Sequence, residues 1–192
     1  MQPNNLILSV IAIVAAVAAH GSAQHRDPKA SAIAMPDFDS RIKAYAALRD
    51  KLGKGDASLD ETSKPKEIVD AGQALAARIQ AARATAKPGD IFTPGIQAQF
   101  KRLLNPEMKG TGGQNTRGII KDEGPGRGGF PLAVNLAYPK DQPFGTVPPN
   151  ILKTLPLLPE HIEYRFVDRH LILHDTRANL IIDFFPNAIP RT

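Results

Sequence analysis

An apolar run of 14 residues, Leu6–Ala19, lies close to the N-terminus and decides how much of the chain is left to fold. The small residues Gly21, Ser22 and Ala23 follow it, as is typical before a signal peptidase cleavage site. A helix that spans a bilayer needs about 20 apolar residues. The pattern therefore predicts a secretory signal peptide over residues 1–23, with a retained anchor as the alternative. Cleavage there leaves 169 of the 192 residues, the size of one domain.

The chain contains no cysteine. This excludes disulfides, thiol catalysis, iron–sulfur clusters and thiolate zinc sites. An exported chain without disulfides depends on an ordinary hydrophobic core, which a chain of this length can bury. The absence of cysteine also favours a bacterial periplasm over a eukaryotic extracellular setting.

The formal net charge is +5, and the positive and negative residues are mixed along the chain. Such a balance fits a soluble basic protein, or one attracted to anionic lipid headgroups, cell-wall polymers or acidic proteins. Nucleic acid is not an expected partner, because the chain has no run of five basic residues and no recognisable nucleic-acid-binding motif.

The first part of the mature chain has the apolar spacing of helices. Residues 24–35 are polar or small and are expected to form a disordered linker. A helical region over residues 36–108 follows. Its first helix is predicted to begin near Pro36 and to stop at Gly53, because apolar residues recur at helical spacing: Phe38, Ile42, Tyr45, Leu48 and Leu52.

Two further helices are predicted in this region. The second runs from about Pro65 to Ala86 and carries a narrow stripe of small and apolar residues. The third begins at Thr93-Pro94, because a threonine side chain can accept a hydrogen bond from an early backbone N–H and proline is tolerated at the first helical position. Asn105-Pro106 is expected to close it.

Residues 109–129 hold eight of the chain's 15 glycines. Glycine at this density costs much backbone entropy in a regular element, so we expect a flexible loop. The stretch from Gly110 to Gly113 lacks the Gly-Lys-Ser/Thr ending of a phosphate-binding loop.

The C-terminal region, residues 130–192, is predicted to be rich in β-structure. An extended segment is expected over residues 131–137 and one helical turn over residues 151–155. Three strands follow, separated by turns at Asp168-Arg169 and at residues 176–179, and the last strand is apolar on both faces. The prediction is an α+β protein with about three N-terminal helices and a small C-terminal antiparallel β-meander.

Two blocks of sequence together resemble a family of secreted bacterial proteins of unknown function. The first is RATAKPGDIFTP at residues 83–94. The second contains EYRFV, LILHD and ANLIID between residues 163 and 183. The resemblance covers most of the mature chain and implies a bacterial protein that faces the cell envelope. It implies no activity.

The C-terminal hairpin alone resembles small bacterial periplasmic modules, some of them linked to nickel and cobalt homeostasis. In those modules a Tyr-Arg strand, as at Tyr164-Arg165, leads to a strand that ends in Asp, as at Asp175. This is an analogy of fold, and fold alone does not carry function.

The weak candidates for a metal site are His170, His174 and Asp175. The two histidines would share one face of a strand but lie about 13 Å apart, because a strand rises by about 3.3 Å per residue. One metal ion cannot bridge that distance, so another ligand such as His161 or Asp168 would have to join. We therefore expect no metal and no cofactor, and solvent-facing strand residues are the favoured interpretation.

Two aspartates near strand ends, Asp175 and Asp183, are the candidates for acid–base chemistry. Burial that moved their pKa values apart would make them an acid and a base. The favoured interpretation is structural, because such an aspartate usually caps a turn or pairs with a nearby arginine. No activated-serine motif is present.

Four charged residues are candidates for partner binding: Arg83, Asp90, Arg117 and Arg127. The first two form either a recognition pair or part of the passage between two helices, where Gly89 permits a left-handed backbone. The other two lie in the glycine-rich segment, for which an unstructured connector is the favoured interpretation and a loop that becomes ordered on a partner is the alternative.

These patterns predict an exported periplasmic or secreted protein that is not an enzyme and that binds an envelope protein or a cell-wall component. After cleavage no stable membrane span is expected. A metal- or ligand-responsive periplasmic module is the alternative, and a small hydrolase that uses carboxylates is the second alternative.

Overall fold

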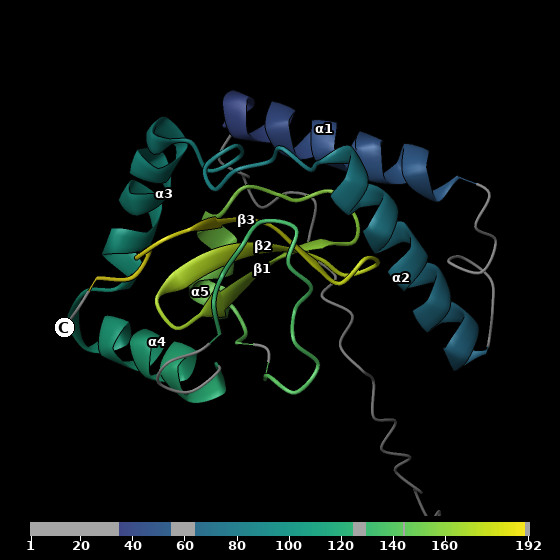
Figure 1. Cartoon of the computed structure of the whole chain (residues 1–192). Coiled ribbons are helices and arrows are strands. Elements are labelled where there is room, and N and C mark those ends of the chain that lie inside the picture. The colour runs from purple at the N-terminus through teal and green to yellow at the C-terminus, as the bar shows by residue number, and fades with distance from the viewer. Residues whose placement is uncertain (1–34, 55–63, 125–129, 144, 191–192) are drawn as a thin grey trace, which may run out of the picture. The chain divides into compact units, whose positions relative to one another are not determined.

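Five helices and three strands follow one another along the described part of the chain, which comprises residues 35–54, 64–124, 130–143 and 145–190 of a computed structural model (Figure 1). The helices are α1 (Pro36–Gly53), α2 (Pro65–Ala82), α3 (Pro94–Glu107), α4 (Gly110–Glu123) and α5 (Pro149–Thr154). The strands are β1 (Ile162–Val167), β2 (His170–Asp175) and β3 (Leu180–Phe185). This order confirms the α+β class.

The predicted signal peptide and residues 24–34 of the predicted linker lie outside the described residues. Met35, the last residue of that linker, is buried and belongs to the core. The described residues all belong to one compact unit, residues 31–192. None of their helices combines the length and apolar character that crossing a membrane requires.

Helices α1 and α3 begin where the sequence places them. Thr93 caps α3, because its side-chain oxygen accepts the N–H of Ile96 at 3.4 Å and Pro94 takes the first helical position. Helix α2 ends at Ala82, four residues earlier than the periodicity indicates. The side chain of the following residue, Arg83, donates hydrogen bonds to Asn135 and to the Ile182 carbonyl.

The prediction of a flexible loop at residues 109–129 is wrong for its larger part, because Gly110–Glu123 form helix α4. Tertiary contacts offset the entropy that glycine costs. A Cβ on Gly113 would lie 2.1 Å from the backbone carbon of Met108, so only glycine permits this close approach. Further along the helix Thr116 and Ile120 are buried. Residues 125–129 of the predicted loop lie outside the described residues.

The three strands form an antiparallel sheet in the order β1-β2-β3, as the predicted meander requires. A β-bulge interrupts the pairing of β2 with β3. Leu173 pairs with Asp183, but its neighbour His174 pairs with Ile181, which leaves Ile182 as an extra residue. The bulge reverses the alternation of side chains, so Asp183 faces the same side of the sheet as Leu173.

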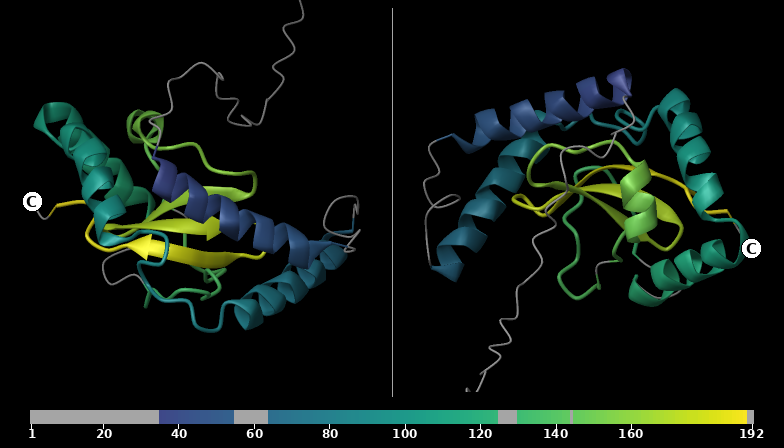
Figure 2. Two further views of the ribbon diagram at one scale, coloured as in Figure 1. Left: turned by 90° about the horizontal axis from the view of Figure 1, so that it is seen from above. Right: turned by 180° about the vertical axis from the view of Figure 1, so that it is seen from behind.

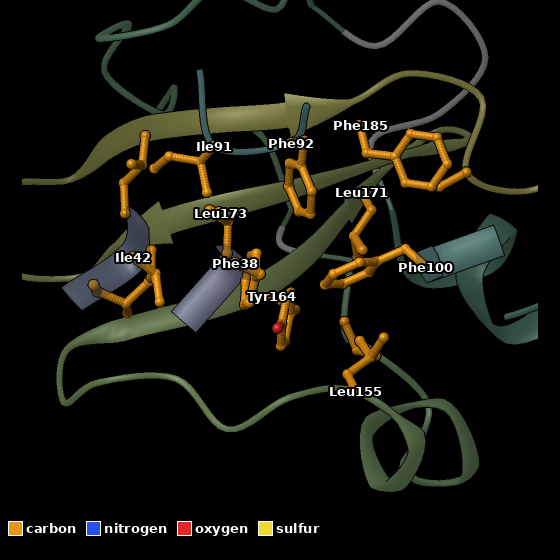
Figure 3. Close-up of a cluster of buried hydrophobic side chains, with 14 of the residues drawn as sticks. Phe38, Ile42, Ile91, Phe92, Phe100, Leu155, Tyr164, Leu171, Leu173 and Phe185 are labelled. Atoms are coloured by element: carbon orange, nitrogen blue, oxygen red, sulfur yellow. The ribbon is translucent and has the colours of Figure 1, made fainter. Parts of the chain in front are cut away.

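One side of the sheet, the helix-covered face, belongs to the main core, which includes residues from all five helices. Figure 2 shows how the helices lie around the sheet. Aromatic rings fill its centre (Figure 3). The ring of Phe38 on α1 lies 5.1 Å from that of Phe100, 5.9 Å from that of Phe92 and 6.4 Å from that of Tyr164. The helical and β parts therefore share one core.

The opposite side, the second face, is covered by residues 130–143, which we call the cover segment. A smaller buried cluster forms there from Tyr138, Val167, Ile172 and Ile181. The segment runs along the edge of β3. The Ile181 carbonyl accepts the N–H of Asn135, and the Ile181 N–H donates to the Leu136 carbonyl. The extended segment predicted here contains a turn and a single β-bridge instead of a strand.

The outer edge of β1 meets Gly145, which forms an isolated β-bridge with Phe166. The Phe166 N–H donates to the Gly145 carbonyl at 3.3 Å. A Cβ on Gly145 would lie 2.6 Å from the Phe166 carbonyl oxygen, so a side chain would push this contact apart. Irregular chain thus lies against both edges of the sheet.

Two glycines of α4 give a matched test of its helical structure. Gly113→Ala is expected to destabilise the protein by about 1–3 kcal/mol, because the new Cβ overlaps the Met108 backbone. Gly118→Ala is expected to stabilise it by about 0.5–1 kcal/mol, because no atom lies within 4 Å of the new Cβ and alanine favours a helix. Urea unfolding measures both. Equal effects of the two changes would contradict helix α4.

Candidate functional site

Asp183 is a fully buried carboxylate that accepts four backbone N–H groups. Its Oδ1 accepts those of Gly89 (2.9 Å) and Phe184 (2.8 Å). Its Oδ2 accepts those of Ile91 and Phe92, each at 2.8 Å. Gly89 has a φ of 91°, the left-handed conformation that the sequence predicts for it. The passage from α2 to α3 is therefore folded around one side chain of β3.

Arg83 joins the same elements from the other end of this passage. Its guanidinium donates to the Asn135 side-chain oxygen at 2.9 Å and to the Ile182 carbonyl at 3.1 Å. Asn135 returns a hydrogen bond to the Arg83 carbonyl at 2.8 Å. Burial lowers the pKa of Arg83. The two sequence blocks that carry the family resemblance are thus in direct contact through Arg83 and Asp183.

Asp175 is also fully buried, at the end of β2. Its Oδ1 accepts the backbone N–H groups of Arg177 and Ala178, both at 2.9 Å, and so closes the turn to β3. Its Oδ2 accepts the hydroxyl of Tyr45 on α1 at 2.8 Å. Burial, followed by the nearby Asp175 carboxylate, raises the pKa of Tyr45 well above its ordinary value. The guanidinium of Arg83 lies 5.0 Å from the centre of the Tyr45 ring.

The environments of Asp175 and Asp183 bear on the idea of an acid–base pair. Each side chain is buried, and both oxygens of each accept hydrogen bonds from the protein itself. Because the protein's own donors occupy both oxygens of each carboxylate, neither carboxylate is placed to contact a substrate. The arrangement supports the structural interpretation of both residues.

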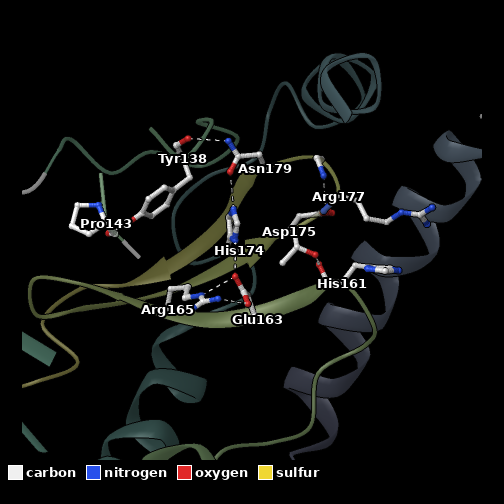
Figure 4. A network of polar contacts seen from close by, with 11 residues as sticks. Tyr138, Pro143, His161, Glu163, Arg165, His174, Asp175, Arg177 and Asn179 are labelled. Carbon is white, nitrogen blue, oxygen red and sulfur yellow. Dashed lines mark hydrogen bonds and ion pairs between the residues drawn. The ribbon is translucent and has the colours of Figure 1, made fainter. Parts of the chain in front are cut away.

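The second face carries a polar network centred on His174 (Figure 4). The His174 ring is almost fully buried, with Nδ1 3.0 Å from Glu163 Oε1 and Nε2 3.0 Å from Asn179 Oδ1. Arg165 binds both oxygens of Glu163, each at 2.7 Å. Burial alone would raise the pKa of Glu163, but the hydrogen bonds from His174 and Arg165 outweigh it and hold the pKa below its ordinary value.

The cover segment closes this network. Asn179 donates from Nδ2 to the Tyr138 carbonyl at 2.9 Å, and the Tyr138 N–H donates to the Asn179 carbonyl at 3.0 Å. The Tyr138 ring lies edge-to-face against His174, with 5.6 Å between ring centres. The network therefore joins β1, β2, the turn before β3 and the cover segment.

His170 and His174 share the second face, as predicted, whereas Asp175 faces the helices. The interpretation of the histidines as solvent-facing is wrong, because His174 is almost fully buried and His170 is half-buried. His170 accepts the Asn187 N–H at Nδ1 (3.2 Å), and burial lowers its pKa. His161 is exposed at the start of β1, 3.5 Å from Glu160. Among the described residues no group of three or more histidines, aspartates or glutamates could hold a metal ion.

The remaining partner-binding candidates lie apart in the fold. The Asp90 side chain is exposed and accepts the Lys87 N–H at 2.8 Å within the passage from α2 to α3. Arg117 on α4 donates to the carbonyl of Met108. Arg127 lies outside the described residues. Neither a hydrogen bond nor an ion pair joins Arg83 to Asp90, since Arg83 bonds to Asn135 and Ile182.

Sequence reasoning missed the partners that define these clusters: Tyr45, Asn135, Tyr138, Glu163 and Asn179. Two of them carried a local signal. Asn135 and Asn179 have positive φ angles, 63° and 51°, a conformation that asparagine tolerates better than most residues. An asparagine therefore favours a turn, as predicted at residues 176–179, but it does not identify the partner of its side chain.

Comparisons with known proteins give no match: no family model, no curated protein and no solved structure resembles the chain closely enough to count. The family resemblance of residues 83–94 and 163–183 stays a prediction.

Asp183→Asn is expected to destabilise the protein by about 3 kcal/mol or more, because an amide offers one acceptor oxygen where four buried N–H groups converge. Asp168→Asn is the matched control. Its side chain is exposed in the β1–β2 turn, and asparagine tolerates its φ of 50°. Urea unfolding compares the two. A loss at Asp183 no larger than that at Asp168 would contradict the assigned role.

We expect the protein to lose stability in mild acid because of His170. Because burial lowers its pKa from 6.5, the folded state binds fewer protons than the unfolded state, so stability is complete above pH 6.5 and falls as the pH drops through it. Urea midpoints at about pH 7.5 and about pH 5.5 measure this fall, which His170→Gln is expected to reduce. His161→Gln, at an exposed site, is expected to leave it unchanged, and the same reduction in both variants would count against the assignment.

Proposed function

We propose that this chain is an exported bacterial envelope protein that binds an anionic partner, an envelope protein or a cell-wall component, without catalysing a reaction. The pattern of residues 1–23 supports export to the periplasm or beyond. The net charge of +5 supports attraction to anionic surfaces.

The observation that carries the proposal is the set of exposed cations on the packed pair α3 and α4. The set comprises Lys101, Arg102, Lys109 and Lys121. Within the described residues none of the four forms an ion pair with a carboxylate. Such cations keep their attraction for an anionic partner.

Two nearby carboxylates are engaged by neutral side chains. Glu107 accepts a hydrogen bond from Asn150 at 2.7 Å, and Glu123 accepts one from Thr146. Both bonds tie α3 and α4 to the chain around α5. The two carboxylates thus connect α3 and α4 to the rest of the fold, and the four cations take no part in these hydrogen bonds.

The alternatives find less support. A metal- or ligand-responsive module needs ligands that converge, and His174 is already bound to Glu163 and Asn179. A hydrolase needs a carboxylate that a substrate reaches, and Asp175 and Asp183 are buried. Calorimetry with Ni²⁺, Co²⁺, Cu²⁺ and Zn²⁺ tests the first alternative directly.

Cross-linking of the tagged full-length protein in its native cell envelope tests the proposal. The wild type is expected to appear as a product that begins at Gln24 and to enrich a specific anionic component. Arg102→Glu combined with Lys109→Glu is expected to lower that enrichment by about fivefold or more, the order of effect of reversing two exposed charges. Quantitative mass spectrometry measures the mature N-terminus and the enrichment.

The control carries the same change in net charge on α1, Lys43→Glu with Lys51→Glu, at two exposed positions. It is expected to enrich the component as the wild type does. Equal losses in both variants would point to general charge attraction and contradict a binding face on α3 and α4. A processed wild type that enriches nothing above an untagged strain would contradict the binding role itself.

A further inference from the structure

The direction of each His174 hydrogen bond depends on which ring nitrogens carry a proton. Both ring nitrogens face oxygen atoms, Glu163 Oε1 and Asn179 Oδ1, each at 3.0 Å. The orientation of the Asn179 amide is fixed, because its Nδ2 donates to the Tyr138 carbonyl and the reverse orientation would set two oxygens against each other. A neutral imidazole donates from one nitrogen only. Only the imidazolium donates at both positions.

We propose that His174 is held as a buried imidazolium and that its deprotonation loosens the cover segment from the second face of the sheet. The binding role proposed above is not needed for this inference.

The groups around His174 act in opposite directions. On β1 the Glu163 carboxylate favours the imidazolium, while Arg165 opposes it because it shares the same carboxylate. From the cover segment Tyr138 presents its ring, and its hydroxyl donates to the Pro143 carbonyl at 2.8 Å. The side chain of Ile181 on β3 is apolar. Among the described residues, Glu163 and Arg165 are the charged members of this network.

The same bonds connect His174 to the cover segment. If Nε2 loses its proton, its lone pair faces the Asn179 oxygen, and the amide must turn to relieve the repulsion. That turn breaks the Asn179 bond to the Tyr138 carbonyl. If Nδ1 loses its proton instead, the lone pair faces the Glu163 carboxylate. Loosening the segment would uncover the apolar residues Val167, Ile172 and Ile181.

Nitrogen NMR of the ¹⁵N-histidine-labelled protein tests the protonation state directly. At about pH 7 both ring nitrogens of His174 are expected to carry a proton. In Glu163→Gln the carboxylate charge that favours the imidazolium is lost, so the ring is expected to be neutral at the same pH. A wild-type spectrum with one unprotonated nitrogen at His174 would overturn the proposal without reliance on any variant.

Hydrogen exchange tests the effect on the cover segment. The probes are the N–H groups of Asn135, Tyr138 and Ile181. Each forms a hydrogen bond between the cover segment and either β3 or the turn before it. The controls are those of Ile91 and Phe92, bonded to Asp183. After correction for intrinsic rates, raising the pH until NMR shows His174 neutral is expected to increase exchange of the probes relative to the controls by about tenfold, the order for losing a hydrogen bond to a charged group.

Glu163→Gln provides the matched comparison, because its His174 is expected to be neutral throughout this pH range. In this variant the ratio of probe to control exchange is expected to stay constant over the same pH range. A constant ratio in the wild type would overturn the effect on the segment, and so would an equal rise in both proteins.

Discussion

The carboxylate of Asp183 and the backbone between α2 and α3 depend on each other. A buried charge costs several kcal/mol unless hydrogen bonds compensate it, and a buried turn leaves N–H groups that need acceptors. Four N–H groups at Asp183 meet both needs. The turn that results directs Phe92 into the core against Phe38 and Phe100. The approach of the helices to the sheet therefore follows from one side chain of the last strand.

The bulge at Ile182 determines which side of the sheet the side chains at the end of β3 face. Without the extra residue, strict alternation would turn Asp183 and Phe185 toward the cover segment. With it, Asp183 lies among the helices, where regular alternation on β2 also places Asp175, while His174 and Glu163 lie on the second face. Asp175 and His174, which are neighbours in the sequence, therefore belong to polar clusters on opposite sides of the sheet.

The elements that the sequence predicts well are those with local causes. Apolar spacing and the cap at Thr93 suffice for α1 and α3, and alternation suffices for the strands. Helix α4 was missed because its contacts join residues far apart in the sequence: Asn150 donates to the Thr116 side chain at 3.1 Å, 34 positions away. The aspartates were found by residue type, but the role of Asp183 depends on donors 91 and 92 positions away and that of Asp175 on Tyr45, 130 positions away.

The contact of Gly145 with β1 bears on how such a chain behaves at high concentration. A three-stranded sheet offers two outer strands whose backbone groups can recruit strands from other molecules, which is how many β-proteins begin to aggregate. Here one edge meets the cover segment and the other meets a glycine whose missing side chain allows backbone to approach backbone. A side chain at position 145 would reopen that edge, so this glycine protects solubility as well as the fold.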